Sequence, residues 1–249
     1  MEQDLSSSSV TMFKDFGAGL VMCGGTILSP KHILTAAHCI TNDATVVVPP
    51  QNVSVYYNNL NRDDQIYTKV TKITPQPDYT NGQVDARLDI AILEIDEITL
   101  DNTARRAPIY SGDIVANQAL LTLGWGQTES GATDTNMLRG TVVYAGNSTL
   151  CSQFSGDWQS NDGPQICTPN ILHAHSSACM GDSGTGLMIN NEGVLSVAGL
   201  VSIAVNIGES ECGNDTGGQL YVNAGYYLDF IANTTGLSKE YLTGLTNDM

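Results

Sequence analysis

The chain has 249 residues, of which 41% are hydrophobic and 14% charged, and its formal net charge is −16. This composition is typical of a globular protein with a sizeable core and excludes a disordered chain. The acidic balance argues against nucleic acid and anionic membranes as partners, because both are bound through basic faces, and no apolar run reaches the roughly 18 residues of a membrane span.

Most of the chain is predicted to form short strands separated by turns rich in Gly, Asn, Asp and Pro. Alternating or β-branched residues predict strands at 10–14, 46–48, 53–57, 66–73, 90–95, 119–125, 141–144 and 194–205. Residues 96–118 lack this alternation and are expected to connect two halves. The stretch "TAAHC" predicts a helical turn, and the spacing of Tyr227, Phe230 and Ile231 predicts a helix near the C-terminal end. Short strands at regular intervals indicate an all-β sandwich or barrels.

The cysteines are even in number and none belongs to a Cys-x-x-Cys pair, which argues against a zinc ribbon or a thioredoxin-type site. In chain order they form three neighbouring couples, which suggests three disulfides and an oxidising compartment, although order alone leaves the pairing open. The six are Cys23, Cys39, Cys151, Cys167, Cys179 and Cys212.

Two further features bear on where the protein works. Four Asn-x-Ser/Thr sequons are compatible with a secreted glycoprotein, and they lie at Asn52, Asn147, Asn214 and Asn233. The leading "MEQDLSSSS" has neither the basic region nor the apolar run of a signal peptide. The chain is therefore either cytosolic with reduced cysteines or trimmed at its start, and we expect a trimmed, secreted protein.

Three stretches carry the residue types that nucleophilic acyl transfer needs. "LTAAHC" contains His38, "LDIAIL" begins an apolar strand with Asp89, and "CMGDSGTG" contains Ser183. A hydroxyl nucleophile requires an imidazole to take and return its proton and a carboxylate to orient that imidazole. Singly, each residue reads as an ordinary turn serine, half-buried histidine or capping aspartate. Their occurrence together, in order among the cysteines, favours the catalytic interpretation.

With "CGG", "GWG" and "GLVS" added in their order, these motifs resemble the trypsin/chymotrypsin family of serine proteases. The resemblance runs from Val10 to Ile231, and the ending "GYYLDFI" is most similar to insect and crustacean chymotrypsin-like (brachyurin-type) members. It implies an all-β fold of two packed six-stranded antiparallel barrels with a C-terminal helix. Residues 1–110 would form one half and residues 111–249 the other, within one peptidase domain whose site lies in the crevice between them.

The resemblance also implies roles for the motif residues. Ser183 would be the nucleophile, His38 the general base and then acid, and Asp89 the orienting carboxylate, while the N–H groups of Gly181 and Ser183 would form the oxyanion hole. Asp182 would pair with a newly cut N-terminal amine. No Ile-Val-Gly-Gly junction precedes Cys23, so we expect a chain that lacks its signal, propeptide and mature start. Taken literally, the sequence leaves Asp182 without its cation, and the site would be zymogen-like.

The family's "GDSGGP" reads "GDSGTG" here, so that Thr185 and Gly186 replace a Gly and a Pro behind the nucleophile. The nucleophile and both expected oxyanion donors are retained, and we expect the change to be tolerated. The disulfides that the resemblance implies are Cys23–Cys39, Cys151–Cys167 and Cys179–Cys212.

A neutral primary specificity pocket is expected, because Ser177 occupies the position where trypsin-like members carry Asp. Lys or Arg would be unpaired there, so a large apolar or aromatic residue is expected before the scissile bond. The resemblance assigns Ser202 and Ile203 to the same pocket, with Ser202 also supporting the buried aspartate. It places Gly218 or Gln219 at the pocket rim, and a one-residue gap decides which of the two.

The sequence thus predicts a secreted, monomeric serine endopeptidase in a digestive role, acting on peptides and proteins and open to protein protease inhibitors. No cofactor and no metal are expected, and His173 and His175 are interpreted as loop residues because no third ligand is near. Two alternatives are a catalytically impaired or zymogen-like homologue that acts as a binding protein, and a cascade protease that cuts one partner.

Overall fold

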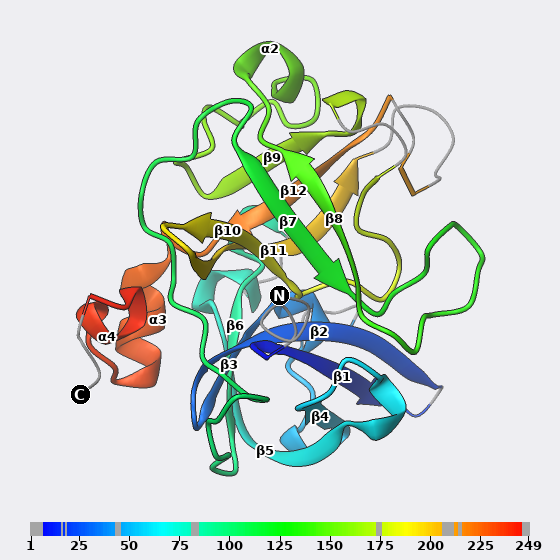
Figure 1. Ribbon diagram of the computed structural model, residues 1–249, viewed down its shortest axis with the longest axis vertical. Coiled ribbons are helices and arrows are strands. Elements are labelled where there is room, and N and C mark those ends of the chain that lie inside the picture. The colour runs from blue at the N-terminus through cyan, green and yellow to red at the C-terminus, as the bar shows by residue number, and fades with distance from the viewer. Residues whose placement is uncertain are drawn as a thin grey trace.

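The computed structural model describes residues 7–15, 17, 19–42, 46–80, 85–172, 176–205, 212–213 and 216–245. In these residues the strands form two six-stranded antiparallel units, the chymotrypsin-like fold that the sequence predicts (Figure 1). The first unit is a closed barrel with the strand order β1-β2-β3-β6-β5-β4. Its strands are β1 (Ser9–Asp15), β2 (Leu20–Ser29), β3 (His32–Thr35), β4 (Val53–Tyr57), β5 (Ile66–Pro75) and β6 (Ala91–Ile95).

The second unit is a half-barrel with the strand order β8-β7-β10-β11-β12-β9. Its strands are β7 (Ala119–Gly124), β8 (Arg139–Tyr144), β9 (Gln165–Pro169), β10 (Gly186–Asn191), β11 (Val194–Val205) and β12 (Gly218–Asn223). The α-helices in the described residues are α2 (Ser148–Cys151), α3 (Leu228–Thr235) and α4 (Lys239–Thr243). The 3-10 turns are η1 (Ala37–Cys39), η2 (Pro50–Asn52), η3 (Arg62–Asp64), η4 (Pro77–Thr80), η5 (Ala86–Leu88) and η6 (Asn170–Leu172).

Residue periodicity accounts for the strands that the sequence predicts. In β5 the side chains alternate, so that Thr68 and Val70 are buried in the barrel while Tyr67 and Lys69 face solvent. The predicted strand at 46–48 is wrong, because Val47 forms only an isolated bridge. Two prolines follow directly, and a proline has no N–H to donate to a ladder.

Several strands next to the junction of the two units lack alternation, and the sequence did not predict them. From Met22 onward β2 is buried throughout, with Ile27 in the core of the first barrel and Leu28 in the core shared by both units. A strand that is covered on both faces reads as a continuous apolar run and gives no period-two signal. For this reason the pattern does not predict β2, β3 and β10, whereas β9 and β12 bury polar as well as apolar residues and likewise show no alternation.

The segment between the units contains no strand from residue 96 to residue 118, as expected, apart from one isolated bridge from Ile109 to Val197. The predicted C-terminal helix is present as α3, and Ile231 packs in a cluster with Ile92 of β6 and Val222 of β12. This helix therefore lies against both units, at the left edge of the view in Figure 1. The expected boundary at residue 110 stays a prediction.

All three expected disulfides are formed, Cys23–Cys39, Cys151–Cys167 and Cys179–Cys212. No helix in the described part of the chain is long and apolar enough to cross a membrane. Asn214, His173 and His175 lie outside the described residues, so the expectations that concern them stay untested.

Candidate active site

Asp89 lies at the junction of the two units, directly after η5. The turn before it is held at two points: the Asp85 carboxylate accepts the Arg87 N–H at 2.9 Å, and the Tyr227 hydroxyl donates to the Arg87 carbonyl at 2.6 Å. Ile90, which is fully buried, follows and leads into β6. These contacts leave the Asp89 side chain only 4% exposed. A carboxylate at such depth must be satisfied by hydrogen-bond donors from the protein.

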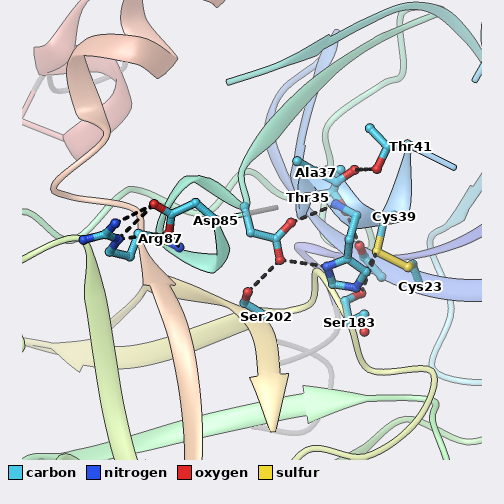
Figure 2. Close-up of polar contacts among 12 residues, drawn as sticks. Cys23, Thr35, Ala37, Cys39, Thr41, Asp85, Arg87, Ser183 and Ser202 are labelled. Carbon is cyan, nitrogen blue, oxygen red and sulfur yellow. Dashed lines mark hydrogen bonds and ion pairs between the residues drawn. A yellow bond between two sulfur atoms is a disulfide. The ribbon is translucent and has the colours of Figure 1, made fainter. Parts of the chain in front are cut away.

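Three donors converge on that carboxylate, as Figure 2 shows by dashed lines. The His38 N–H donates to Oδ1 at 2.8 Å, His38 Nδ1 lies 2.7 Å from Oδ2, and the Ser202 hydroxyl donates to Oδ2 at 2.6 Å. Burial opposes ionisation, but the charge and hydrogen bonds of His38 and Ser202 outweigh it and hold the pKa of Asp89 below its usual value. An ionised Asp89 accepts the proton of Nδ1, so Nε2 of His38 is left as the basic nitrogen.

The His38 turn η1 is fixed from three sides. Its neighbour Cys39 is bonded to Cys23 of β2, and the imidazole faces Asp89. From β1 the buried Lys14 ammonium donates to the carbonyls of His38 at 2.7 Å and Thr41 at 2.8 Å. A cation that binds the last carbonyls of a helical turn stabilises its C-terminal end. The sequence does not predict this role of Lys14, because nothing in the local pattern distinguishes a buried lysine from an exposed one.

Ser183 reaches this group through its main chain. Its carbonyl accepts the Gly24 N–H at 2.8 Å and lies 3.5 Å from Cys39 Sγ, an atom that is itself 3.7 Å from His38 Nε2. The Cys39 sulfur therefore links the Ser183 main chain to the imidazole of His38. The Ser183 hydroxyl has no hydrogen-bond partner among the described residues. The structure therefore places His38, Asp89 and Ser183 in one region, and His38 and Asp89 are directly hydrogen-bonded.

The main chain around Ser183 has a distinct pattern of used and unused N–H groups. Those of Asp182, Gly184 and Thr185 donate to protein carbonyls. Those of Gly181 and Ser183 have no acceptor in the described part of the chain. Gly181 has φ of 95°, a conformation that favours glycine. Two N–H groups without a protein acceptor, one on each side of Asp182 in the chain, are the kind of donors that an anion-binding site requires.

Asp182 points away from Ser183 into the second unit. Its carboxylate accepts the N–H groups of Gly126 at 2.8 Å and Cys179 at 2.9 Å. A Cβ on Gly124 or Gly126 would overlap this carboxylate, which explains the two glycines of the "GWG" motif. Burial raises the pKa of Asp182 to about 6, and the two N–H bonds only partly offset it. Asp182 borders a cavity of about 180 Å³ that is also lined by Ser177.

A second cavity, of about 450 Å³, opens beside Ser183. Of the expected pocket residues, Ser202, Ile203 and Gln219 line it. Gln219 is buried, and its side-chain amide donates to the Ala178 carbonyl at 3.1 Å.

Two expected pocket residues have other surroundings. Ser177 borders the cavity of Asp182, and its hydroxyl bonds the carbonyl of Ala178 and the N–H of Gly213. A Cβ on Gly218 would meet the ring of Phe154. Neither is among the described residues that line the second cavity.

One group in the described residues has metal-ligand atoms close together, Cys23, His38 and Cys39. The two sulfurs are joined in a disulfide, so no thiolate is available to bind an ion. The arrangement suits acyl transfer, for which it holds an oriented imidazole, a nearby hydroxyl and paired N–H donors.

Comparison with known proteins agrees with this geometry. A family model described as Trypsin matches residues 4–231. The chain is 34% identical to "Trypsin Tyr p 3.0101" of Tyrophagus putrescentiae over 215 residues, which cover 84% of this chain and 70% of that protein. It is 31% identical to a trypsin of Simulium vittatum (76% and 72% covered) and 30% identical to chymotrypsin-like elastase family member 1 of Rattus norvegicus (75% and 69% covered). The finer likeness to brachyurin-type members stays a prediction. The chain belongs to the trypsin family of serine proteases.

Proposed function

We propose that the protein is a secreted serine endopeptidase that hydrolyses peptide bonds through an acyl-enzyme on Ser183. The observation that carries the proposal is the buried Asp89 carboxylate bonded to His38 Nδ1 at 2.7 Å, with Nε2 3.7 Å from the Cys39 sulfur that lies 3.5 Å from the Ser183 carbonyl. The proposal includes a monomeric enzyme in a digestive role, with peptides and proteins as substrates and protein protease inhibitors as partners. The three disulfides support an oxidising, extracellular location.

In the proposed mechanism, Ser183 Oγ attacks the scissile carbonyl as its proton passes to His38 Nε2. The imidazolium is stabilised by Asp89, and the developing oxyanion accepts the N–H groups of Gly181 and Ser183. His38 then gives the proton to the leaving amine, and water repeats the sequence to release the acid. The hydroxyl and Nε2 need not be bonded in the free enzyme, because such contacts often tighten only when substrate is bound.

We propose that the 450 Å³ cavity receives a large apolar or aromatic side chain before the scissile bond. No carboxylate is present among the described lining residues, so a Lys or Arg side chain would be buried without a partner. Gln219 would limit the depth of the cavity, because its amide is anchored to the Ala178 carbonyl. In this proposal the Gln219 side chain would keep the substrate residue from Ser177, which the family pattern puts at the pocket base and which does not line the cavity.

We also propose that Asp182 receives a cationic amine, as the activation carboxylate of the family does. Its partners among the described residues are N–H groups, and a raised pKa of about 6 is the mark of a carboxylate buried without a cation. The adjoining 180 Å³ cavity offers space for an ammonium group.

The first prediction tests the reaction. The wild-type protein should cleave bonds in a peptide library, and Ser183→Ala should lower kcat by about 10⁶-fold because the nucleophile is lost. His38→Ala should lower kcat by about the same factor. The double variant should lower kcat no further than either single variant, because the two residues act as a unit. Cleavage is followed by mass spectrometry of the products, with unchanged circular dichroism as the control. Equal turnover by wild type and Ser183→Ala would refute the mechanism.

The second prediction concerns the pocket. Gln219→Gly should deepen the cavity and raise kcat/KM for aromatic over leucine substrates by roughly tenfold. Gln219→Glu has nearly the same shape and adds a charge, so it should begin to cleave after Lys and Arg. Library cleavage profiles report both. If both variants keep the wild-type profile, Gln219 does not border the substrate side chain.

The third prediction concerns Asp182 in the protein without a bound amine. Because its folded pKa is raised from 3.8 to about 6, the protonated form stabilises the fold below about pH 4, and this stability is lost as pH rises through about 6. Between these limits the wild type should lose up to about 3 kcal/mol of unfolding free energy relative to Asp182→Asn. Urea unfolding from pH 4 to 7 measures the difference. Parallel curves for the two proteins would show that Asp182 is not a buried, uncompensated acid.

A further inference from the structure

Thr185 is one of the two residues at which this chain departs from the family's motif, and it is almost completely buried, with 1% of its surface exposed. Its hydroxyl donates to the Asp182 carbonyl at 2.6 Å, and its backbone N–H donates to the same oxygen at 3.0 Å. Asp182 to Thr185 thus form a tight turn with Ser183 and Gly184 at its centre, where Gly184 has φ of 78°. A glycine at this position would supply only the N–H bond.

The Asp182 carbonyl and the Ser183 N–H belong to the same peptide unit. That unit is planar and trans, so its oxygen and its N–H point in opposite directions. Two hydrogen bonds from Thr185 onto the oxygen therefore fix the direction of the Ser183 N–H. This N–H has no acceptor among the described residues and is one of the two donors proposed for the oxyanion hole.

The methyl group of Thr185 has a separate role in the packing. It lies where a Cβ on Gly24 would be, so it contacts the backbone whose N–H donates to the Ser183 carbonyl at 2.8 Å. Both backbone groups of Thr185 are hydrogen-bonded as well: its N–H donates to the Asp182 carbonyl, and its carbonyl accepts the Val201 N–H at 3.0 Å. The side chain is held in one orientation by these contacts, with its hydroxyl aimed at Asp182.

We propose that the Thr185 hydroxyl is a positioning group for the Ser183 N–H, and that it strengthens transition-state binding without touching the substrate. The inference rests on the proposed function, because the oxyanion hole has a use only if the protein hydrolyses acyl bonds. A donor that is better oriented before the reaction stabilises charge as it develops, so its loss lowers kcat more than it changes KM.

The test compares variants that separate the hydroxyl from the methyl. Thr185→Val keeps the branched shape and loses the hydroxyl, and it should lower kcat about 3- to 10-fold, the equivalent of one hydrogen bond, with KM within about twofold. Thr185→Ser keeps the hydroxyl and should retain most of kcat. Thr185→Ala, which lacks both groups, should resemble Thr185→Val in kcat.

A second readout isolates the oxyanion. A peptidyl trifluoromethyl ketone forms a hemiketal with the nucleophile and places a negative oxygen on the donors, whereas the matching peptide alcohol forms none. The affinity of Thr185→Val for the ketone should fall in parallel with kcat, while its affinity for the alcohol stays constant. Urea unfolding measures the stability of each variant, so that a loss of kcat or of affinity caused by partial unfolding can be recognised.

Any one of three results would overturn the positioning role. They are a wild-type kcat in Thr185→Val, an equal loss of kcat in Thr185→Ser, and a loss of affinity for the ketone and the alcohol together. If the wild type neither cleaves peptides nor binds the ketone more tightly than the alcohol, the proposed function itself fails and this inference with it. An active wild type with an indifferent Thr185→Val overturns the inference alone.

Discussion

The buried carboxylate of Asp89 is the interaction on which the site depends. Removing an ionised carboxyl group from water is costly, and the cost is offset only where several donors are already in position. Two of those donors belong to His38 of the first barrel, and the third is Ser202 on β11 of the second unit. The carboxylate therefore has all three donors only when both units are assembled.

Ser202 is available for this contact because of an irregularity in its strand. The pairing of β11 with β12 shifts register between Val201 and Ile203, and a bulge of this kind redirects the side chain of the extra residue. On the other side, Lys14 and the Cys23–Cys39 bridge fix the turn that carries His38. The imidazole thus has little freedom to leave the carboxylate.

The nucleophile segment is held mainly by its main chain, with Thr185 the exception. The Gly24 N–H donates to the Ser183 carbonyl. The Val201 carbonyl accepts the Gly184 N–H, and the Val201 N–H donates to the Thr185 carbonyl. Close approach of this kind needs positions without a Cβ. A side chain on Gly24 would overlap Thr185, and one on Gly124 would overlap the Asp182 carboxylate. These glycines are required by what packs against them.

The sequence predicts the features that are written as local patterns. Alternating strands such as β5, the disulfide pairs implied by the family and the motifs around His38, Asp89 and Ser183 could all be recognised before the structure. It could not predict β2, which is buried on both faces and has no alternation.

Long-range contacts were equally inaccessible to sequence reasoning. The pairing of Lys14 with the His38 carbonyl spans 24 positions, and the anchoring of Gln219 on Ala178 spans 41. Contacts between residues so far apart in the chain are defined by the tertiary fold. In the same way, the sequence predicts only that Thr185 is a tolerated change from the family's motif, and it does not predict that the Thr185 hydroxyl closes the turn that carries Ser183.

The central claim is that Asp89, by orienting His38, makes Ser183 a nucleophile. The most direct measurement is the second-order rate at which a fluorophosphonate modifies the protein, with the modified residue located by peptide mass spectrometry. The account predicts a single adduct on Ser183, formed with loss of fluoride, and a rate that falls by about 10⁴-fold in Asp89→Asn, in which the imidazole takes the wrong tautomer. Modification of another residue, or an equal rate in Asp89→Asn, would contradict it.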